Sequence, residues 1–535
     1  MLSIRCLLVA IALVPLATAA RSDDAVRAKL DAGIDSDSDA RYPVLIRFKT
    51  QLFKRGGDYE AFAKKHNAEK RNKLRAMVLK TLRGNAASSW KQVGKVVEAL
   101  EKDDSIRGMQ RFWIVNGFAC TATYAACKKL AALDEVEFVY YQRTSVRQHK
   151  RARRFKPSAA RLAGMKKVYR QVLDAWKDDS NDLLKTDGLE IPWNVSRVRA
   201  DVAWSKEDAT GKGVVVALMD SGLMVAPALS RALWRNTKEK LNGKDDDGNG
   251  YVDDLFGYDF GADLFYCLGD GARMTHGSMC GGIIAGRPLN SKKLLTGIAP
   301  RAKLMMLRGM GLLKSYEYAL ANGADIVSMS FMFTQQNLGN YRGVYRLAHE
   351  HLAAGGVTAV GGAGNFAAGR RALPKGKQIA IPKDIPCVIC AAGIVKSGSA
   401  PPFSSRGPCS WKGVKFYDDY PEDKPLRKPD VTGCIGGYPV WGRPFTLGGR
   451  WKIVSKEGAD FALLRGPQGN SFSGPHAAGV AALMLSVNPE LNPWEVKRLM
   501  VSSCRDIGPK GWDETYGAGL LDAAGAVRAA KSVRK

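Results

Sequence analysis

The sequence predicts an α/β protein in which a small α+β unit precedes a mostly parallel sheet. Two observations predict the sheet: apolar, strand-like runs alternate with helix patterns from Ile191 to the C-terminus, and one of these runs ends in Asp220. Such alternation is typical of a parallel sheet covered by helices on both faces, a three-layer arrangement. The third observation is a shorter alternation of strand and helix patterns over residues 21–142, which predicts the smaller unit.

The first residues have the composition of a secretory leader. Residues 1–20 contain one basic residue, Arg5, followed by an apolar run over 6–16 and small residues at 17–19. This pattern predicts a signal peptide that is too short to span a bilayer. No other apolar stretch is long enough for a membrane span, so we expect a secreted, extracellular protein.

The remaining composition excludes a disordered or fibrous protein. With 535 residues, 45% of them hydrophobic, the chain can bury a large core and holds more than one domain. Ten cysteines become nine once Cys6 leaves with the leader, so at least one thiol is unpaired within the chain. Cys387 and Cys390 form a CxxC pair in an apolar run, but no second pair completes a zinc site.

Residues 21–142 form the predicted small unit. Strand patterns alternate with helix-forming stretches, in the order strand, helix, strand, helix, strand. The stretches are Tyr42 to Lys49, Asp58 to Leu82, Met109 to Val115, Ala125 to Leu133 and Val136 to Tyr141.

A basic linker at residues 143–190 follows this unit. The formal charge of the chain is +29, and Arg143 to Arg170 holds eleven Lys or Arg and no acid. One interpretation is a solvated, cleavable linker, with Lys150 to Arg154 as an exposed run that proteases cut. The alternative is a binding module for polyanions. Aromatic residues are not interleaved with the charges, so we expect no nucleic-acid partner. A short amphipathic helix is predicted within Leu162 to Trp176.

Residues 191–535 form the predicted larger domain. In such a sheet, sites lie beyond the carboxyl ends of the strands, as Asp220 does. The strand-like and helix-like runs are Val214 to Asp220, His276 to Gly286, Lys303 to Leu307, Asp325 to Phe331, Tyr341 to Ala354, Val357 to Val360, Cys387 to Ile394, Pro475 to Leu485 and Pro493 to Val501.

Ser471 is the candidate nucleophile. It lies in the octapeptide Gly469 to His476, which runs directly into a helix of small and apolar residues. A serine in this position can present its hydroxyl beyond the helix N-terminus, next to the helix amides and dipole. The alternative is an N-cap serine that opens an ordinary buried helix.

An acid and a base accompany this serine. Asp220 ends an apolar run in Asp-Ser-Gly, and His276 lies in Thr-His-Gly-Ser. Imidazole has the right pKa to take the hydroxyl proton and return it to a leaving amine. The chain has six histidines. His276 is the candidate base by motif and by elimination, because the other five are His66 and His149 in the small unit and linker, His349 and His351 in a predicted helix, and His476 just past the serine.

With the order Asp, His, Ser, the chain resembles the subtilisin-like serine proteases, or subtilases. The resemblance covers about residues 191–535 and implies a serine endopeptidase that forms an acyl-enzyme on Ser471. Asn365, in Val-Gly-Gly-Ala-Gly-Asn, matches the oxyanion-hole motif, whereas an asparagine after glycine is otherwise a turn residue. Protein or peptide substrates would bind extended, as an added strand beside Ser330, Phe331, Met332, Gly362, Ala363 and Gly364.

Residues 21–142 resemble the ferredoxin-like propeptide of this family, through Asn116 to Ala119 and Asp134 to Val139. The resemblance implies a zymogen in which this unit acts as intramolecular inhibitor and folding chaperone, with cleavage somewhere between Arg143 and Ile191. We expect the product to be a monomer.

Several residues depart from the family pattern. Met332 and Phe333 replace small glycines, Asn470 replaces threonine before the nucleophile, Phe472 and Ser473 replace Met-Ala after it, and Met279 replaces a second histidine. An inactive or narrowly specific homologue is therefore the alternative within the same fold. Cys280, four residues after His276, is similar to a cysteine of proteinase K-like members and predicts a free thiol near the base.

An acidic loop gives a candidate calcium site. Asp245, Asp247 and Asn249 have the spacing of the first ligands of a calcium loop, with Gly250 at its turn and Asp253 following. The twelfth position is Phe256 rather than glutamate, so this is not a complete EF-hand. Related subtilases bind stabilising calcium through similar insertions, which favours calcium here over a solvated acidic turn.

Overall fold

The computed structural model describes residues 23–35, 40–144, 146–148, 157–176, 188–269, 274–288, 294–334, 337–443, 452–456 and 462–534. The predicted leader and the basic run 150–154 lie outside these residues. The chain forms two compact units, each described here by itself. The first takes the described residues of Met1–Lys54, Thr81–Ala152 and Asn337–Val344, and the second those of Arg55–Lys80, Arg153–Gln336 and Tyr345–Lys535.

The first unit is built on a four-stranded antiparallel sheet in the order β2-β3-β1-β4. Its core joins alternate side chains of the strands, such as Val44, Ile46 and Phe48, to apolar residues of two helices. The elements are β1 (Arg41–Phe48), α3 (Arg71–Lys102), β2 (Ile106–Phe112), β3 (Gly117–Thr123), α4 (Tyr124–Ala132) and β4 (Val136–Tyr141).

This unit has one strand more than the sequence predicted. The stretch expected as one strand, Met109 to Val115, holds the end of β2 and part of the turn at residues 113–116, and β3 follows that turn. Asn116 has a φ of 36°, which asparagine tolerates better than most residues. Gly117 follows because a Cβ there would lie 2.1 Å from the carbonyl oxygen of Ile46.

The helix predicted at Asp58 to Leu82 is two helices. Helix α2 (Asp58–Lys65) ends where the amide of His66 bonds to Phe62, and α3 begins at Arg71. Helix α2 and residues 71–80 of α3 belong to the second unit, although the rest of α3 belongs to the first. Hydrophobic periodicity cannot detect this division, because both parts of α3 bury one face.

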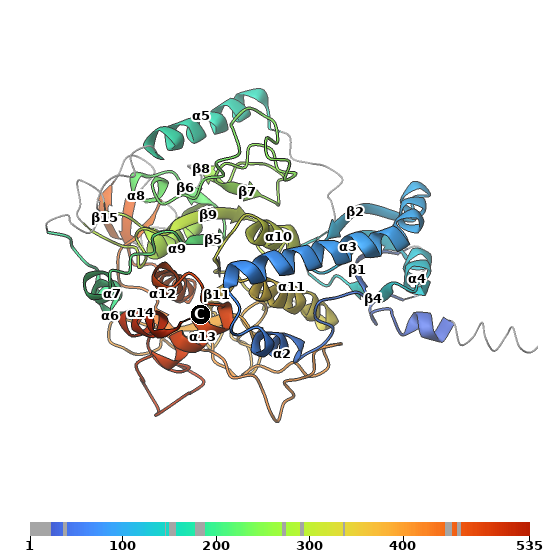
Figure 1. The fold of residues 1–535 in the computed structure, drawn as a ribbon. Helices are drawn as coiled ribbons and strands as arrows, with labels where there is room; N and C mark the ends of the chain where they lie inside the picture. Colours follow the sequence, from blue (N-terminus) through green and yellow to red (C-terminus); the bar gives the residue numbers. More distant parts are fainter. Residues whose placement is uncertain are drawn as a thin grey trace, which may run out of the picture. The chain divides into compact units, whose positions relative to one another are not determined.

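The second unit contains a seven-stranded, wholly parallel sheet (Figure 1). The predicted parallel sheet is therefore confirmed. Strand order reverses beside β5, because the chain first adds strands on one side of β5 and then on the other. In spatial order the strands are β13 (Val431–Cys434), β12 (Ile389–Ile394), β11 (Thr358–Gly362), β10 (Ile326–Met329), β5 (Val215–Met219), β9 (Lys303–Arg308) and β7 (Gly257–Asp259).

Helices cover both faces of this sheet, which confirms the three-layer arrangement (Figure 1). Helices α9 (Thr275–Ala285) and α12 (Ser473–Val487) share a core with Val216 and Leu218 of β5. On the other face, α10 (Leu313–Ala321) and α11 (Arg342–Ala354) contact methionines at the strand ends. Ser315 Oγ lies 3.6 Å from the sulfur of Met219, and His349 Nε2 lies 3.4 Å from that of Met329.

Further elements belong to the second unit, except η2, which is part of the first. The helix predicted after the linker is α5 (Ala159–Trp176), and its Tyr169 is buried against Phe265. No helix among the described residues is both long and apolar enough to cross a membrane. The remaining elements are α6 (Trp193–Arg197), α7 (Ala200–Glu207), β6 (Leu223–Met224), α8 (Pro227–Ser230), β8 (Leu268–Gly269), η2 (Gly339–Tyr341), β14 (Val440–Gly442), β15 (Lys452–Lys456), β16 (Ala462–Arg465), α13 (Pro493–Ser502) and α14 (Ala523–Ser532).

Candidate active site

Asp220 follows directly after β5, at the carboxyl edge of the sheet. Its side chain is buried, and one carboxylate oxygen accepts a 2.6 Å hydrogen bond from the amide of Ser221. This bond turns the carboxylate away from the strand and toward α9. The carboxyl edge beside the reversal of strand order is where parallel sheets form their sites.

His276 is the second residue of α9, and it faces Asp220. Its Nδ1 lies 2.9 Å and 3.0 Å from the two carboxylate oxygens. The close approach of the two segments requires Gly277, because a Cβ there would lie 2.2 Å from the carbonyl oxygen of Gly222. With Nδ1 held by Asp220, Nε2 is the ring nitrogen left to exchange a proton.

The pair changes the pKa of both groups. The Asp220 carboxylate raises the pKa of His276 well above its usual value. The His276 side chain is 43% exposed, so water screens part of this attraction. Burial alone would raise the pKa of Asp220, but the imidazolium and the Ser221 amide together hold it below its usual value. The arrangement therefore favours a carboxylate beside a readily protonated base.

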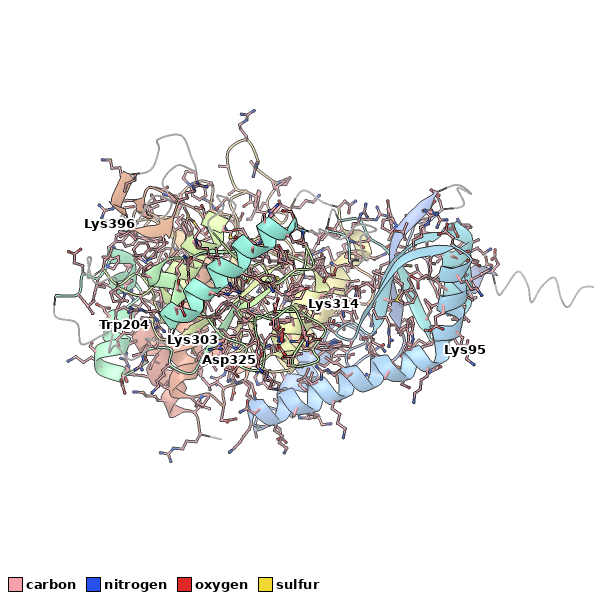
Figure 2. The ribbon with its side chains drawn as sticks, turned by 90° about the horizontal axis from the view of Figure 1, so that it is seen from above. Lys95, Trp204, Lys303, Lys314, Asp325 and Lys396 are labelled. Carbon is pink, nitrogen blue, oxygen red and sulfur yellow. The ribbon has the colours of Figure 1, made fainter. Side chains whose placement is uncertain are left out.

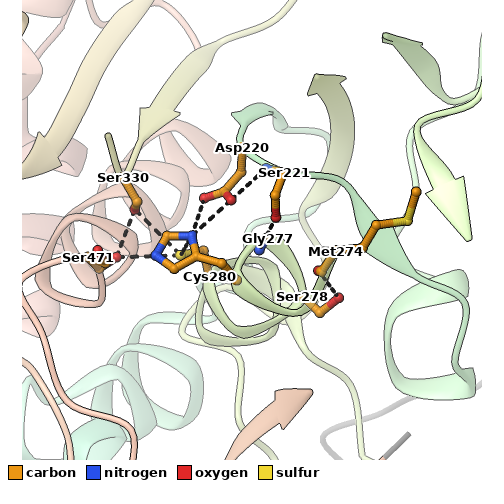
Figure 3. A network of polar contacts seen from close by, with 9 residues as sticks. Asp220, Ser221, Met274, Gly277, Ser278, Cys280, Ser330 and Ser471 are labelled. Carbon is orange, nitrogen blue, oxygen red and sulfur yellow. Dashed lines mark hydrogen bonds and ion pairs between the residues drawn. The ribbon is translucent and has the colours of Figure 1, made fainter. Parts of the chain in front are cut away.

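Ser471 is brought to the same place by two contacts to its carbonyl oxygen. Ser330 Oγ donates to this oxygen at 2.8 Å, and Cys280 Sγ lies 3.5 Å from it. Cys280 Sγ in turn lies 3.9 Å from His276 Nδ1. Figure 3 shows Asp220, Cys280, Ser330 and Ser471 gathered around one point. Residues from three distant motifs thus meet at the carboxyl edge of the sheet, beside the first residues of α12.

Cys280 is a free, fully buried thiol, as expected from its position on α9. Burial raises the pKa of the thiol above its usual value, which keeps it protonated and weakly nucleophilic. A carboxylate oxygen of Asp220, a ring nitrogen of His276 and the sulfur of Cys280 lie within 4.8 Å of one another. The thiol therefore lies next to His276, and its raised pKa makes it a poor nucleophile in comparison with Ser471, the candidate.

Asn365 follows β11 and is held by the residue before the serine. Its Oδ1 accepts a 2.8 Å hydrogen bond from the main-chain amide of Asn470. The Asn470 side chain donates to Gly364 O at 2.6 Å and to Ser404 Oγ at 3.1 Å. The bond from the Asn470 amide occupies the acceptor oxygen of the Asn365 carboxamide and leaves its Nδ2 donor available for a ligand.

The two segments expected to bind substrate follow the neighbouring strands β10 and β11. Ser330, Phe331 and Met332 come after Met329, and Gly362, Ala363 and Gly364 run from the last residue of β11. The Met332 sulfur would lie 3.1 Å from a Cβ on Gly364, so the methionine occupies space between the segments. Phe333 turns inward and stacks against Tyr345 at 5.3 Å between ring centroids.

The family comparison agrees with this geometry. The model of the subtilase family matches residues 211–519, which is more than half of the chain and includes Asp220, His276, Asn365 and Ser471. The chain belongs to the subtilase family.

The subtilase relatives are distant in sequence. A calcium-dependent protease of Trichormus variabilis is 28% identical over 292 residues, covering 49% of this chain and 40% of the relative. Bacillopeptidase F of Bacillus subtilis is 24% identical over 492 residues, or 88% of this chain and 30% of the relative. M-protease of Shouchella clausii is 23% identical over 357 residues, or 64% and 71%. The chain thus spans less than half the length of the first two.

Two residues of this subtilase site were missed by the sequence analysis. Ser404 Oγ accepts a hydrogen bond from the Asn470 side chain, and its segment Phe403 to Gly407 resembles the family without indicating this contact. Lys383 is fully buried, and its ammonium donates to the carbonyl oxygen of Phe331 and lies 4.9 Å from the Phe331 ring centroid. Burial lowers the pKa of Lys383 to about 7. A lone lysine between Pro382 and Asp384 resembles an ordinary surface residue.

The buried His476 has structural contacts. His476 is fully buried in α12, with Nδ1 2.8 Å from the carbonyl oxygen of Phe472 and Nε2 3.0 Å from Asn194 Nδ2. Because the carbonyl oxygen can only accept, Nδ1 carries the proton and donates it in a hydrogen bond, and Nε2 accepts from Asn194 Nδ2. Burial lowers the pKa of His476 to about 4, which keeps the ring neutral.

The acidic loop of this subtilase folds around Asn249 and Gly250. Asp245 accepts hydrogen bonds from the amides of both residues at 3.1 Å and 2.8 Å, and Asp247 accepts one from Asn249 at 3.1 Å. Asp253 contacts other residues. It accepts from the amides of residues 242 and 243 and lies 3.7 Å from the Lys166 ammonium.

Two further acidic residues lie near this loop, and the spacing of Asp245, Asp247 and Asn249 in the sequence does not indicate them. Glu239 and Asp254 are both buried, and Oε2 of Glu239 has no hydrogen-bond donor among the described residues. Burial, with the carboxylates of Asp254 and Asp247, raises the pKa of Glu239 to about 7. Burial also raises the pKa of Asp254. Carboxylates of this kind supply the oxygen ligands that a divalent cation takes.

Proposed function

We propose that this subtilase is a secreted serine endopeptidase, made as a zymogen, that hydrolyses peptide bonds through an acyl-enzyme on Ser471. One observation carries the proposal: His276 Nδ1 is bonded to both oxygens of a buried carboxylate, at 2.9 Å and 3.0 Å, next to the main chain of Ser471. This arrangement fixes the tautomer that a general base for serine requires.

In the proposed reaction, His276 Nε2 takes the proton of the Ser471 hydroxyl as its oxygen attacks the substrate carbonyl carbon. Asp220 holds the opposite nitrogen and stabilises the imidazolium that forms. His276 then protonates the leaving amine. Water attacks the resulting ester in a second cycle of the same proton transfers, which releases the acid product and restores the serine.

The developing oxyanion would lie against the Asn365 Nδ2 donor and the amide of Ser471. Asn470 supports this role, because it bonds to the acceptor oxygen of Asn365 and so directs the donor away from it. Ser471 precedes α12, so the positive end of the helix dipole adds to the stabilisation. Fixed donors of this kind need no reorganisation as charge develops.

A protein or peptide substrate would lie extended between the segments after β10 and β11. Met332 narrows the space between them, which favours a restricted choice of side chain over the broad acceptance that glycine would allow. The region predicted as propeptide, residues 21–142, would act as the inhibitor, and the linker at 143–190 would be cut during maturation. The leader at 1–20 would direct secretion.

We also propose that the acidic loop binds a structural calcium ion. Asp245, Asp247 and Asn249 would supply ligands as the sequence indicated, and the buried Glu239 and Asp254 would complete the set. Bound calcium would neutralise carboxylates that otherwise repel one another and would fasten the loop to the sheet. A calcium-dependent protease among the relatives supports this assignment.

Labelling with a fluorophosphonate tests the catalytic proposal, because this reagent reacts only with an activated serine. We expect the processed protein to be labelled and Ser471→Ala to lose the label. Ser397→Ala is the matched control, because Ser397 is an exposed loop serine bonded to Ser399. Failure to label the processed wild-type protein would instead favour an inactive homologue.

A further inference from the structure

Lys383 lies between the two segments that the proposed function assigns to substrate binding. Its ammonium donates to the carbonyl oxygen of Phe331 in the segment after β10, and it lies 4.9 Å from the centroid of the Phe331 ring. Its aliphatic chain passes Gly361, which directly precedes the segment of residues 362–364. A Cβ on Gly361 would lie 2.1 Å from Lys383 Cε, so only glycine leaves room for this side chain. The lysine therefore contacts the chain at the carboxyl ends of both β10 and β11.

Two backbone contacts fix the loop that carries Lys383. The carbonyl oxygen of Ile381 accepts from the amide of Phe333 at 3.0 Å, and that of Asp384 accepts from the indole of Trp411 at 2.8 Å. Lys383 itself is 1% exposed. These contacts determine where the side chain begins, so the ammonium is held inside the protein and does not extend into water.

The ammonium has no ion-pair partner among the residues that the structure describes. It has three N–H donors, and among these residues one acceptor, the carbonyl oxygen of Phe331, serves them. Burial lowers the pKa of Lys383 to about 7, and the carboxylates of Asp384 and Asp220 offset this only in part, because they lie beyond ion-pair distance. A buried ammonium in this state lacks both a counter-charge and part of its hydrogen bonding.

Two other lysines show the more usual arrangement. Lys428 is fully buried, and its Nζ lies 2.7 Å from Asp430 Oδ2. Lys314, which Figure 2 labels, is only partly buried and still lies 2.7 Å from Glu317 Oε2. In each case the protein supplies the counter-charge from its own sequence. Lys383 differs from both, which favours a counter-charge supplied by a ligand.

The side chains beside the ammonium can be reached from solvent. Phe331 and Met332 are partly exposed, and Asn365, at the end of the other segment, is exposed. Met332 occupies the space between the segments, because its sulfur would lie 3.1 Å from a Cβ on Gly364. Its unbranched side chain has several rotatable bonds and adapts readily to a neighbour. A substrate side chain that moves Met332 aside therefore comes next to Phe331 and the Lys383 ammonium.

The proposed oxyanion hole determines which substrate residue reaches this place. Asn365 directly follows Gly364, so a residue whose carbonyl oxygen lies against the Asn365 donor has its side chain near residues 362–364. That residue is the one that supplies the scissile carbonyl.

A carboxylate is the ligand that this environment favours. It accepts the donors that Phe331 leaves free, and attraction between opposite charges is strong where water is excluded. A carboxylate at this position also favours the charged form of Lys383, because a nearby negative charge raises the pKa of an ammonium. A neutral amide offers no counter-charge, and a cationic side chain would be repelled.

We propose that Lys383 determines substrate specificity, and that its ammonium binds the carboxylate of a glutamate or aspartate that supplies the scissile carbonyl. The inference rests on the proposed endopeptidase and names its substrate class, which is proteins or peptides cut after an acidic residue. Lys383 contacts the substrate side chain and takes no part in the proton transfers.

Paired peptide substrates test this specificity. The two peptides differ only in glutamate or glutamine at the residue that supplies the scissile carbonyl, so they match in size and differ in charge. For the processed enzyme, we expect kcat/KM to be at least about tenfold higher with glutamate. A third peptide with lysine at this residue should be cut more slowly than the glutamine peptide.

Substitution of Lys383 assigns the preference to this residue. Lys383→Met keeps an unbranched side chain and removes the ammonium, so kcat/KM should fall much more for the glutamate peptide than for the glutamine peptide. A purely structural role would change both values alike. Lys377→Met is the matched control, because Lys377 is exposed in the same connection between β11 and β12, and the ratio of the two values should equal that of the wild-type enzyme.

Binding to the Ser471→Ala protein gives a measure that does not depend on catalysis. Isothermal titration calorimetry with the same pair should show that the glutamate peptide binds at least about tenfold more tightly than the glutamine peptide. The inference is overturned by equal values for the pair, by a preference for glutamine, or by a glutamate preference that Lys383→Met retains. If Lys383→Met fails to fold, the comparison of the two peptides with the wild-type and Ser471→Ala proteins still decides the question.

Fluorophosphonate labelling judges the proposed function separately. A labelled enzyme that cuts both peptides equally well would overturn the role of Lys383 and leave the endopeptidase in place. A protein that is not labelled, but whose Ser471→Ala form prefers the glutamate peptide, would overturn the catalytic proposal and leave the binding site for an acidic side chain in place.

Discussion

The main-chain amide of Asn470 donates to Oδ1 of Asn365 at 2.8 Å, so the residue before the candidate nucleophile fixes the carboxamide opposite it. Asn470 occupies a position where the family resemblance implies threonine. Its side chain donates to Gly364 O and Ser404 Oγ, which ties it to the two loops around Asn365. Asn470 therefore adds to the rigidity of the proposed oxyanion hole rather than blocking it.

Replacing Asn365 should reduce turnover much more than substrate binding. Asn365→Ala removes a donor that acts on the developing oxyanion, so kcat should fall by roughly 10²–10³ with little change in KM. Steady-state kinetics on a peptide substrate measures both constants. Asn322→Ala is a control, because Asn322 caps the distant α10. A loss confined to KM would contradict the assigned role.

The sequence singled out the catalytic candidates because each lies in a short motif at an element boundary. Asp220 closes an apolar strand, and Ser471 opens a small-residue helix, so local pattern and position agree. Ser404 and Lys383 could not be found in this way. Their roles arise from contacts with Asn470 and Phe331, residues that lie far from them along the chain, and such contacts leave no periodic trace.

The same limit applies to the acidic loop and to the small unit. Loop spacing identified Asp245, Asp247 and Asn249, but Glu239 approaches them only through the fold. The apolar pattern predicted one strand where the β2–β3 hairpin lies, because the turn of this hairpin contains Trp113 and Ile114 rather than a run of turn residues. Sequence patterns report local geometry, whereas these features depend on packing between segments.

Replacing Asp220 should impair the base and shift its titration. Asp220→Asn favours the wrong tautomer of His276, so kcat should fall by about 10⁴. Because Asp220 raises the pKa of His276, and only the neutral ring accepts a proton, activity is lost as pH falls through this pKa. Removing the carboxylate lowers the pKa, so the acid limb of residual activity should move to lower pH. A pH profile with an unmoved acid limb would contradict the pairing.

Modifying Cys280 should inhibit the enzyme, although the thiol is not the nucleophile. An organic mercurial on a sulfur 3.9 Å from His276 Nδ1 would displace the imidazole. Burial raises the thiol pKa, so modification should be slow and time-dependent. Cys280→Ala should resist the reagent, whereas Cys504→Ala should remain sensitive. Full activity after modification confirmed by mass spectrometry would refute this placement.

Removing calcium should destabilise the protein if the acidic loop binds this ion. Chelation should lower Tm by several degrees, because a ligand bound only to the native state stabilises it by mass action. Glu239→Gln should weaken the calcium dependence by removing one negative ligand. Glu422→Gln is the control, because Glu422 is an exposed residue paired with Lys412. Equal melting with and without calcium in the Ser471→Ala protein would count against the site.

Lys383 should make the free energy of unfolding increase as pH rises. Burial lowers its pKa in the folded protein to about 7, whereas an unfolded lysine titrates near 10.4. Between these values the unfolded chain binds a proton that the folded protein does not bind. The free energy of unfolding should therefore rise with pH across this window, by up to about 1.4 kcal/mol per pH unit, and stay lower below pH 7.

Urea unfolding of Ser471→Ala at pH 6, 7.5 and 9 measures this slope without self-digestion. Lys383→Met should flatten the slope and stabilise the protein most at pH 6, because it removes an ammonium that must be desolvated. Lys396→Met is the control, because Lys396 is exposed in a loop. A slope unchanged in Lys383→Met would mean that the ammonium keeps its charge in the folded protein, stabilised by the carbonyl oxygen of Phe331 beside the substrate segment.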